Sequence, residues 1–154
     1  MVMSALDKLV LIDTSIWIYY FRGEKEVYNK VNELIDSGKV CSLGLVIAEL
    51  IQGAKTEKEV RVIKDMATVF PQLTEGADSW EKAGVLSFQL KKVGKSIGLA
   101  DCYIATIAKE NEATIYTLDE HFKEIRNHID ITLLYQNYFS PQQIEIKEVE
   151  DADQ

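Results

Sequence analysis

The chain has 154 residues, enough for one domain with its own core, and its 47% of hydrophobic residues is ordinary for a soluble globular protein. Its formal net charge of −8 argues against a simple nucleic-acid-binding module, because phosphate contacts need Lys and Arg. The same charge argues less strongly against an enzyme whose bound metal ion supplies positive charge at a reacting phosphate.

The ends and the cysteines of the chain predict a cytoplasmic protein with no membrane partner. No apolar stretch approaches membrane-spanning length, and residues 1–7 lack the features of a signal peptide. Cys41 and Cys102 have neither a metal-binding spacing nor a disulfide pattern. The last ten residues hold five acids and one lysine. Their net charge is therefore half of the total net charge of the chain. We therefore expect one domain over residues 1–140 and a disordered acidic tail over residues 141–154.

The first half of the chain alternates between short apolar runs and amphipathic segments. In chain order we expect a strand at 8–12, a helix at 15–21 capped by Thr14 or Ser15, a helix at 24–36, a strand at 40–43 and a helix ending near Gly53. Thr56 starts the next helix, with Glu59 three residues on completing a capping box.

The second half continues the alternation. We expect a strand at 69–73 interrupted or bounded by Pro71, an amphipathic helix at 77–93 that carries Trp80, a helix at 99–110, a strand at 113–118, a short helix at 120–127 and a strand at 131–134. Strands that alternate with helices predict an α/β fold, a doubly wound and mostly parallel sheet of about four to five strands flanked by helices.

Four acids stand at the starts and ends of these predicted elements. Asp13 closes the first strand and is followed by the hydroxyls of Thr14 and Ser15. Glu49 lies in the first turns of a helix, Asp101 lies at the start of another, and Asp119 follows a strand. In a doubly wound sheet, strand ends and the helix starts that follow them share one edge, so all four acids can converge there.

Such a convergence is costly without a cation. Two carboxylates about 5 Å apart repel by roughly 3 kcal/mol at an effective dielectric constant of about 20. A raised pKa or a bound divalent metal relieves this repulsion. A site made only of oxygen ligands suits Mg²⁺ or Mn²⁺, and such an ion activates water for phosphodiester hydrolysis.

Each acid alone also has a structural explanation. Asp13 could cap the following helix, and Asp119 could be a plain N-cap. Glu49 could be a solvated helix residue, and Asp101 could be a first-turn acid favoured by the helix dipole. Only the ordered set of four outweighs these separate explanations.

The ordered motifs resemble the PIN-domain ribonucleases, and within them the VapC-type toxins of toxin–antitoxin pairs. They are the strand followed by Asp13-Thr14-Ser15, then Ala48-Glu49-Leu50, then Leu99-Ala100-Asp101-Cys102-Tyr103-Ile104-Ala105, then Thr117-Leu118-Asp119-Glu120-His121-Phe122. The resemblance covers about residues 8–135. Each motif alone is weak, and the ordered set is fairly specific.

The resemblance implies a metal-dependent endoribonuclease that cleaves structured RNA. It assigns Asp13 and Asp101 as the principal metal ligands, and Glu49 and Asp119 to a second metal or to the orientation of water. Ser15 and Thr117 match polar positions that flank the site. Homodimers and inhibition by a small antitoxin that inserts a segment near the acids are implied by the resemblance alone. A PIN-domain nuclease that processes RNA without being a toxin stays open as an alternative.

Three other classes of protein share part of the pattern. A phosphatase of the haloacid dehalogenase type needs a second acid two residues after Asp13, where this chain has Ser15. A metal-dependent adhesion site fits Asp13 and Ser15, but its last serine position is occupied by Trp17. A catalytically silent domain that only binds protein remains possible, although retention of all four acids argues against it.

The remaining polar and aromatic residues favour structural roles. We interpret His121 and His128 as surface or packing residues, and Cys102 as part of the core. The cluster Trp17, Tyr19, Tyr20 and Phe21 indicates core packing or a dimer face more than base stacking.

Overall fold

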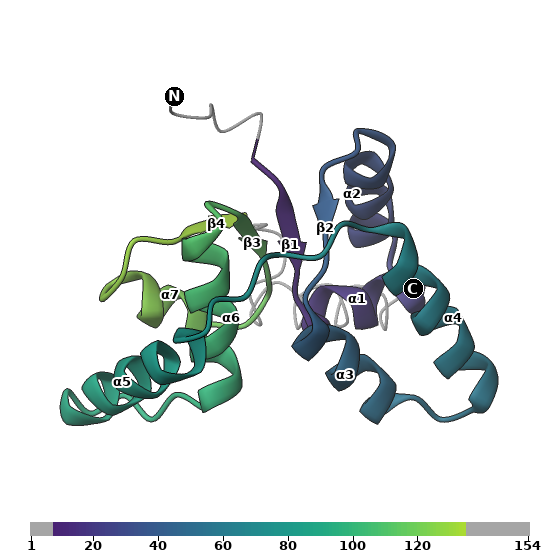
Figure 1. Ribbon diagram of the computed structural model, residues 1–154. Helices are drawn as coiled ribbons and strands as arrows, with labels where there is room; N and C mark the ends of the chain where they lie inside the picture. The colour runs from purple at the N-terminus through teal and green to yellow at the C-terminus, as the bar shows by residue number, and fades with distance from the viewer. Residues whose placement is uncertain (1–7, 135–154) are drawn as a thin grey trace, which may run out of the picture.

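The computed structural model describes residues 8–134, in which four short strands lie between two groups of helices (Figure 1). The elements in chain order are β1 (Val10–Ile12), α1 (Thr14–Phe21), α2 (Lys25–Asp36), β2 (Val40–Cys41), α3 (Gly44–Gly53), α4 (Glu57–Val69), α5 (Ser79–Lys92), α6 (Leu99–Glu110), β3 (Thr114–Tyr116), α7 (His121–Arg126) and β4 (Thr132–Leu134). Helices α1–α4 form one group, and α5–α7 form the other.

All strand pairs are parallel, and the strand order is β2-β1-β3-β4. This order confirms the predicted α/β class and the parallel sheet. Strands β1 and β3 occupy the middle of the sheet, and the register pairs Ile12 with Tyr116. The chain segments that follow β1 and β3 therefore emerge side by side at the same edge.

Helix α6 is the central helix of the second group. Its residues 102–108 are all buried, because the helix lies among α5, α7 and β3. A helix that is apolar around its whole circumference needs neighbours on every side, which explains this run of buried residues. Cys102 is fully buried, as expected for a core residue.

Two predictions about secondary structure are wrong: the strand at 69–73 and the start of the first helix. The segment 69–73 is not a strand: it makes a single parallel bridge, between Gln72 and Ser42, because Pro71 has no N–H to extend a ladder. The first helix begins one residue earlier than predicted, so its N-cap position falls on Asp13 instead of Thr14 or Ser15. By contrast, the capping box of Thr56 and Glu59 is present.

Trp80, which was expected on the amphipathic helix that became α5, is half exposed and lies at the border of the core. It stacks on Tyr103 of α6, with ring centroids 3.7 Å apart. Within residues 8–134, no helix has the length and apolar character needed to span a membrane. The predicted tail at 141–154 and the domain boundary at 140 lie outside the described residues.

Candidate active site

The register of the two central strands brings the first acid and a threonine together. Asp13 follows β1 and Thr117 follows β3, one residue beyond the Ile12–Tyr116 pair. The Asp13 N–H donates to the Tyr116 carbonyl oxygen at 2.9 Å, which continues the ladder to the edge of the sheet. Both side chains are buried, with exposed fractions of 5% for Asp13 and 0% for Thr117.

Asp13 makes no cap hydrogen bond with its side chain, although it occupies the N-cap position of α1. Its Oδ2 instead accepts hydrogen bonds from Thr117 Oγ1 at 2.9 Å and from Ser15 Oγ at 3.1 Å. These hydroxyls also accept from the backbone: Ser15 Oγ from the Leu118 N–H, and Thr117 Oγ1 from the Asp119 N–H. The carboxylate of Asp13 is therefore held between the first turn of α1, through Ser15, and the loop after β3, through Thr117.

The other three acids approach from different elements. Glu49 is the sixth residue of α3, which follows the edge strand β2, and Asp101 is the third residue of α6. Asp119 lies in the loop after β3, where its Oδ1 accepts a hydrogen bond from the His121 N–H at 3.0 Å. All four predicted acids thus lie at the carboxyl edge of the sheet or on a helix that starts there.

The acids interact electrostatically as one group. Burial raises the pKa of Asp13, against the effect of its hydroxyl donors, and repulsion from Asp101 raises it further. Burial also raises the pKa of Glu49, with added repulsion from Asp13 and Asp101. The pKa of Asp101 is raised by burial and by Asp119, although a hydrogen bond to His121 opposes the shift. Each of these acids therefore resists ionisation because of its buried or negatively charged surroundings.

His121 also lies at this site. The sequence favours a surface or packing role for this residue and does not predict this position. Its Nδ1 is 3.0 Å from Asp101 Oδ2 and 3.6 Å from Asp119 Oδ1. The hydrogen bond to Asp101 raises the pKa of His121. The sequence signal was the spacing Asp-x-His at the start of a helix, but the contact depends on the turn that the Asp119 side chain forms. His128 is exposed, as predicted.

The residues present fit a divalent cation. Among the described residues, Glu49 Oε1 and Thr14 Oγ1 are buried side-chain oxygens that lack a hydrogen-bond partner. Asp101, Asp119 and His121 offer ligand atoms that all lie within 4.8 Å of one another. Carboxylate and hydroxyl oxygens are hard ligands, and a cation would relieve the repulsion that raises the pKa of the acids.

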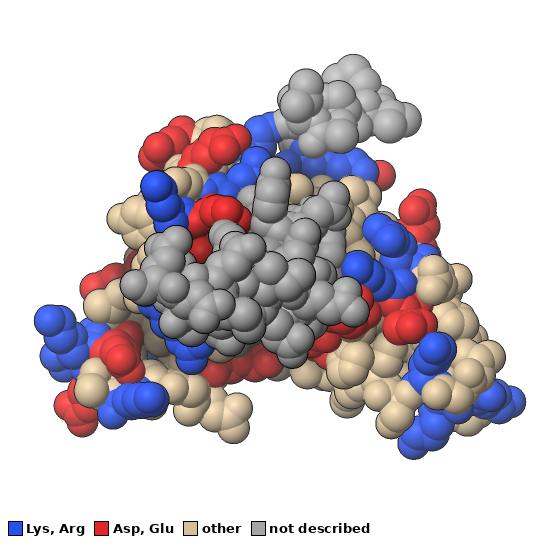
Figure 2. Space-filling model, turned by 180° about the vertical axis from the view of Figure 1, so that it is seen from behind, with Lys and Arg blue, Asp and Glu red and all other residues tan. Residues whose placement is uncertain are grey.

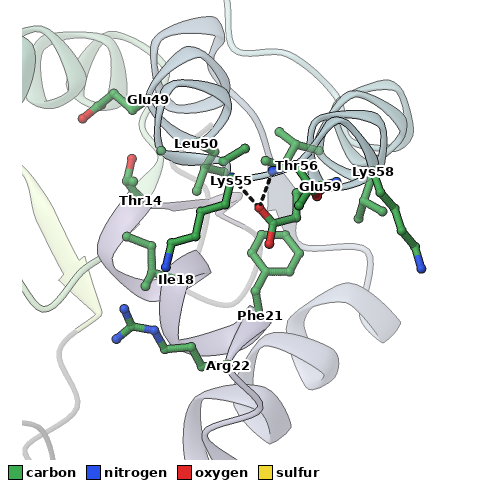
Figure 3. A pocket seen from close by; sticks show the side chains of 14 residues that line it. Thr14, Ile18, Phe21, Arg22, Glu49, Leu50, Lys55, Thr56, Lys58 and Glu59 are labelled. Carbon is green, nitrogen blue, oxygen red and sulfur yellow. Dashed lines mark hydrogen bonds between the residues drawn. The ribbon is translucent and has the colours of Figure 1, made fainter.

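A cavity of about 640 Å³ opens beside the site, between α1, α3 and the start of α4 (Figure 3). Glu49 and Thr14 lie at one end of it. Phe21 and Leu50 supply apolar lining, and the side chain of Lys55 extends toward that of Arg22. The cavity therefore combines an apolar lining with cationic groups, next to one of the four acids.

The charges on the surface are unevenly distributed. Figure 2 shows a band of Asp and Glu side chains across the lower middle of the molecule. Lys and Arg side chains lie on the two lower arms, which hold α4 and α5, where acidic side chains are interspersed, and also near the top of the molecule. A bound cation would reduce the negative charge that a polyanion meets at this band of acids.

The parallel sheet and the acids at its edge define an α/β protein with a candidate metal centre, and comparison with known proteins places it in a family. The family model for the PIN domain matches residues 10–127, which is most of the chain. The chain belongs to the PIN-domain family.

The chain is similar to curated ribonucleases of this family. Ribonuclease VapC2 of Haemophilus influenzae is 31% identical over 104 residues, which cover 64% of this chain and 77% of that protein. Ribonuclease VapC11 of Mycobacterium tuberculosis is 24% identical over 122 residues, which cover 76% of this chain and 91% of that protein.

Solved structures share the fold. VapBC2 from Rickettsia felis, bound to a DNA fragment from its promoter, matches with a TM-score of 0.65 and 23% identity over 84% of this chain and 99% of that chain. VapBC-1 from nontypeable Haemophilus influenzae matches with a TM-score of 0.65 and 22% identity over 82% of this chain and 96% of that chain.

Proposed function

We propose that the chain is a metal-dependent endoribonuclease of the VapC type, and the toxin of a toxin–antitoxin pair. The observation that carries this proposal is the convergence of Asp13, Glu49 and Asp101 from three elements, each with a raised pKa. Asp119 belongs to the same group, because its negative charge also raises the pKa of Asp101. Membership of the PIN-domain family and similarity to ribonucleases support the choice of RNA as substrate.

The four acids have separate roles in this proposal. Asp13 and Asp101 are the principal ligands of Mg²⁺ or Mn²⁺, and Asp119 and Glu49 complete the centre or orient water. Ser15 and Thr117 fix the carboxylate of Asp13 by donating to its Oδ2. Thr14 presents an oxygen that lacks a hydrogen-bond partner among the described residues. The bound ion would polarise a phosphoryl oxygen and lower the pKa of the attacking water.

Cleavage of RNA by the purified full chain tests the proposal. With Mg²⁺ or Mn²⁺ the wild type should cut RNA, and excess chelator should stop it. Asp13→Asn should lower the rate on the order of 10³-fold, since the metal contribution amounts to several kcal/mol. Asp36→Asn removes the same charge at an exposed residue at the end of α2 and should cut normally. Cleavage that persists in chelator or in Asp13→Asn contradicts the proposal.

The cavity beside Glu49 supports an antitoxin partner. Its apolar lining suits the apolar face of a partner segment, and Arg22 and Lys55 suit acidic side chains on that segment. Co-expression with the product of a small neighbouring reading frame should give a complex that no longer cuts RNA. Lys55→Glu should weaken this complex, whereas Lys64→Glu, on α4 outside the cavity, should not. Equal effects of the two changes would argue against this surface.

We also propose a cytoplasmic homodimer. Helix α5 exposes large apolar side chains, Val85 and Phe88 among them, and the adjoining Leu99 of α6 is 47% exposed. Contact with a second copy would remove such side chains from water. RNA and a protein antitoxin are both partners that a cytoplasmic location supplies.

A further inference from the structure

His121 is held beside two of the acids by its local structure. It is the first residue of α7, and its N–H donates to Asp119 Oδ1 at 3.0 Å. The next residue, Phe122, is fully buried and anchors the helix start in the core. The imidazole remains half exposed, with Nδ1 3.0 Å from Asp101 Oδ2. The backbone of His121 is thus fixed, while its ring lies at the open side of the centre.

The spacing of the three groups fits one ion. The ligand atoms of Asp101, Asp119 and His121 lie within 4.8 Å of one another. Opposite ligands of an octahedral ion with bonds of about 2.1 Å are about 4.2 Å apart. Small side-chain movements would therefore bring all three atoms into a single coordination shell. An ion that took Asp101 Oδ2 and His121 Nδ1 as ligands would replace the hydrogen bond between these two atoms.

We propose that the His121 imidazole is a nitrogen ligand of the cation that Asp101 and Asp119 hold, and that it biases the centre toward Mn²⁺ over Mg²⁺. This inference rests on the metal centre of the proposed function. Mg²⁺ is a hard ion that prefers carboxylates and water, whereas imidazole binds transition metals more strongly. A centre made of oxygen ligands alone would lack this source of discrimination.

Pulsed electron paramagnetic resonance of Mn²⁺ on the full chain, without a histidine tag, tests the inference directly. Nitrogen that is bonded to Mn²⁺ modulates the electron spin echo. The chain has two histidines, so the signal has two possible sources, His121 and His128. His128 is exposed and is not among the three clustered residues. We expect nitrogen modulation in the wild type and in His128→Asn, and its loss in His121→Asn.

Binding titrations separate ligation from hydrogen bonding. In His121→Asn the amide can still donate to Asp101, but the imidazole is gone. We expect the affinity for Mn²⁺ to fall at least about tenfold, and that for Mg²⁺ to change less than about twofold.

Three results would overturn the inference. Mn²⁺ bound without nitrogen coordination, or an equal loss of affinity for both ions, would leave His121 as a hydrogen-bond donor while the metal centre stands. An absence of Mn²⁺ binding to the wild type would overturn both the inference and the metal dependence of the proposed function.

Discussion

Thr117 connects two parts of the candidate site through one hydroxyl. It is fully buried, it donates to Asp13 Oδ2, and it accepts from the Asp119 N–H, each at 2.9 Å. The same oxygen thus orients the first acid and fixes the loop that holds the fourth. The resemblance to PIN domains indicated a polar residue here, but only the register of β1 and β3 explains why it faces Asp13.

Replacing Thr117 by Val should therefore damage the site and the fold together. The change leaves the Asp119 N–H unpaired and removes a donor from Asp13, which should cost about 1–3 kcal/mol of unfolding free energy. Thr117→Ser keeps the hydroxyl and should cost less and preserve RNA cleavage. Urea unfolding of the two variants measures the difference. A smaller loss in Thr117→Val than in Thr117→Ser would mean that the methyl group matters more than the hydrogen bonds.

The raised pKa of Asp13 gives a prediction about stability and pH. A carboxyl with a raised pKa binds more protons in the folded state than in the unfolded state, so stability falls as pH rises through that pKa. In chelator, Asp13→Asn should melt above the wild type, and the gap should widen as the pH rises above about 4, the ordinary pKa of an aspartic acid. Added Mn²⁺ should stabilise the wild type more than the variant. A gap that narrows as pH rises would contradict this.

Apolar periodicity in the sequence marked Asp13, Asp101 and Asp119, because each of them stands near an element boundary. Glu49 lies inside α3 and was picked out only as part of the ordered set of motifs. The sequence did not locate His121. That contact depends on the turn between Asp119 and His121, and a half-exposed histidine gives no periodic signal. The hydrogen bonds of Asp13 likewise depend on strand register, which is a property of the folded chain.

Helix α6 determines where Asp101 lies, and α5 packs directly against it. Leu90 of α5 is fully buried, whereas its neighbour Gln89 is exposed. The two positions therefore offer a matched test of how far this packing stabilises the fold.

Leu90→Ala should lower the unfolding free energy by about 3 kcal/mol, through lost apolar contact and the cavity left behind. Gln89→Ala should stay within about 0.5 kcal/mol of the wild type. Denaturant unfolding with both variants checks this, and a small effect at Leu90 would show that α5 contributes little to the core.

Helices were predicted more successfully than strands. The helix at 99–110 matches α6 at both ends, since its apolar residues and the preceding glycine mark it clearly. The strands are only two or three residues long, shorter than the apolar runs that predicted them. Pairing partners set their ends, and a single sequence does not reveal them; at 69–73 one bridge replaced the expected strand.

For the molecule as a whole, the parallel sheet could be predicted from the sequence, because parallel strands need crossover connections and the predicted strands alternate with helices. The strand order β2-β1-β3-β4 could not, although it places the sequence-distant Asp13 and Thr117 side by side.

The exposed apolar side chains of α5 predict that two copies of the chain associate. Light scattering of the full chain should give twice the 17.5 kDa of one chain at micromolar concentration. Phe88→Glu, which places a charge on the exposed apolar face of α5, should shift the mass toward one chain. A single-chain mass for the wild type across concentrations would contradict the homodimer.

Mapping RNA ends in cells after brief induction tests the central claim most directly. If the four acids form the centre of an endoribonuclease, the wild type should create new internal RNA ends at a restricted set of sites. Asp13→Asn, produced at the same level and folded, should create none. The same new ends with both proteins, or none with the wild type, would contradict the account.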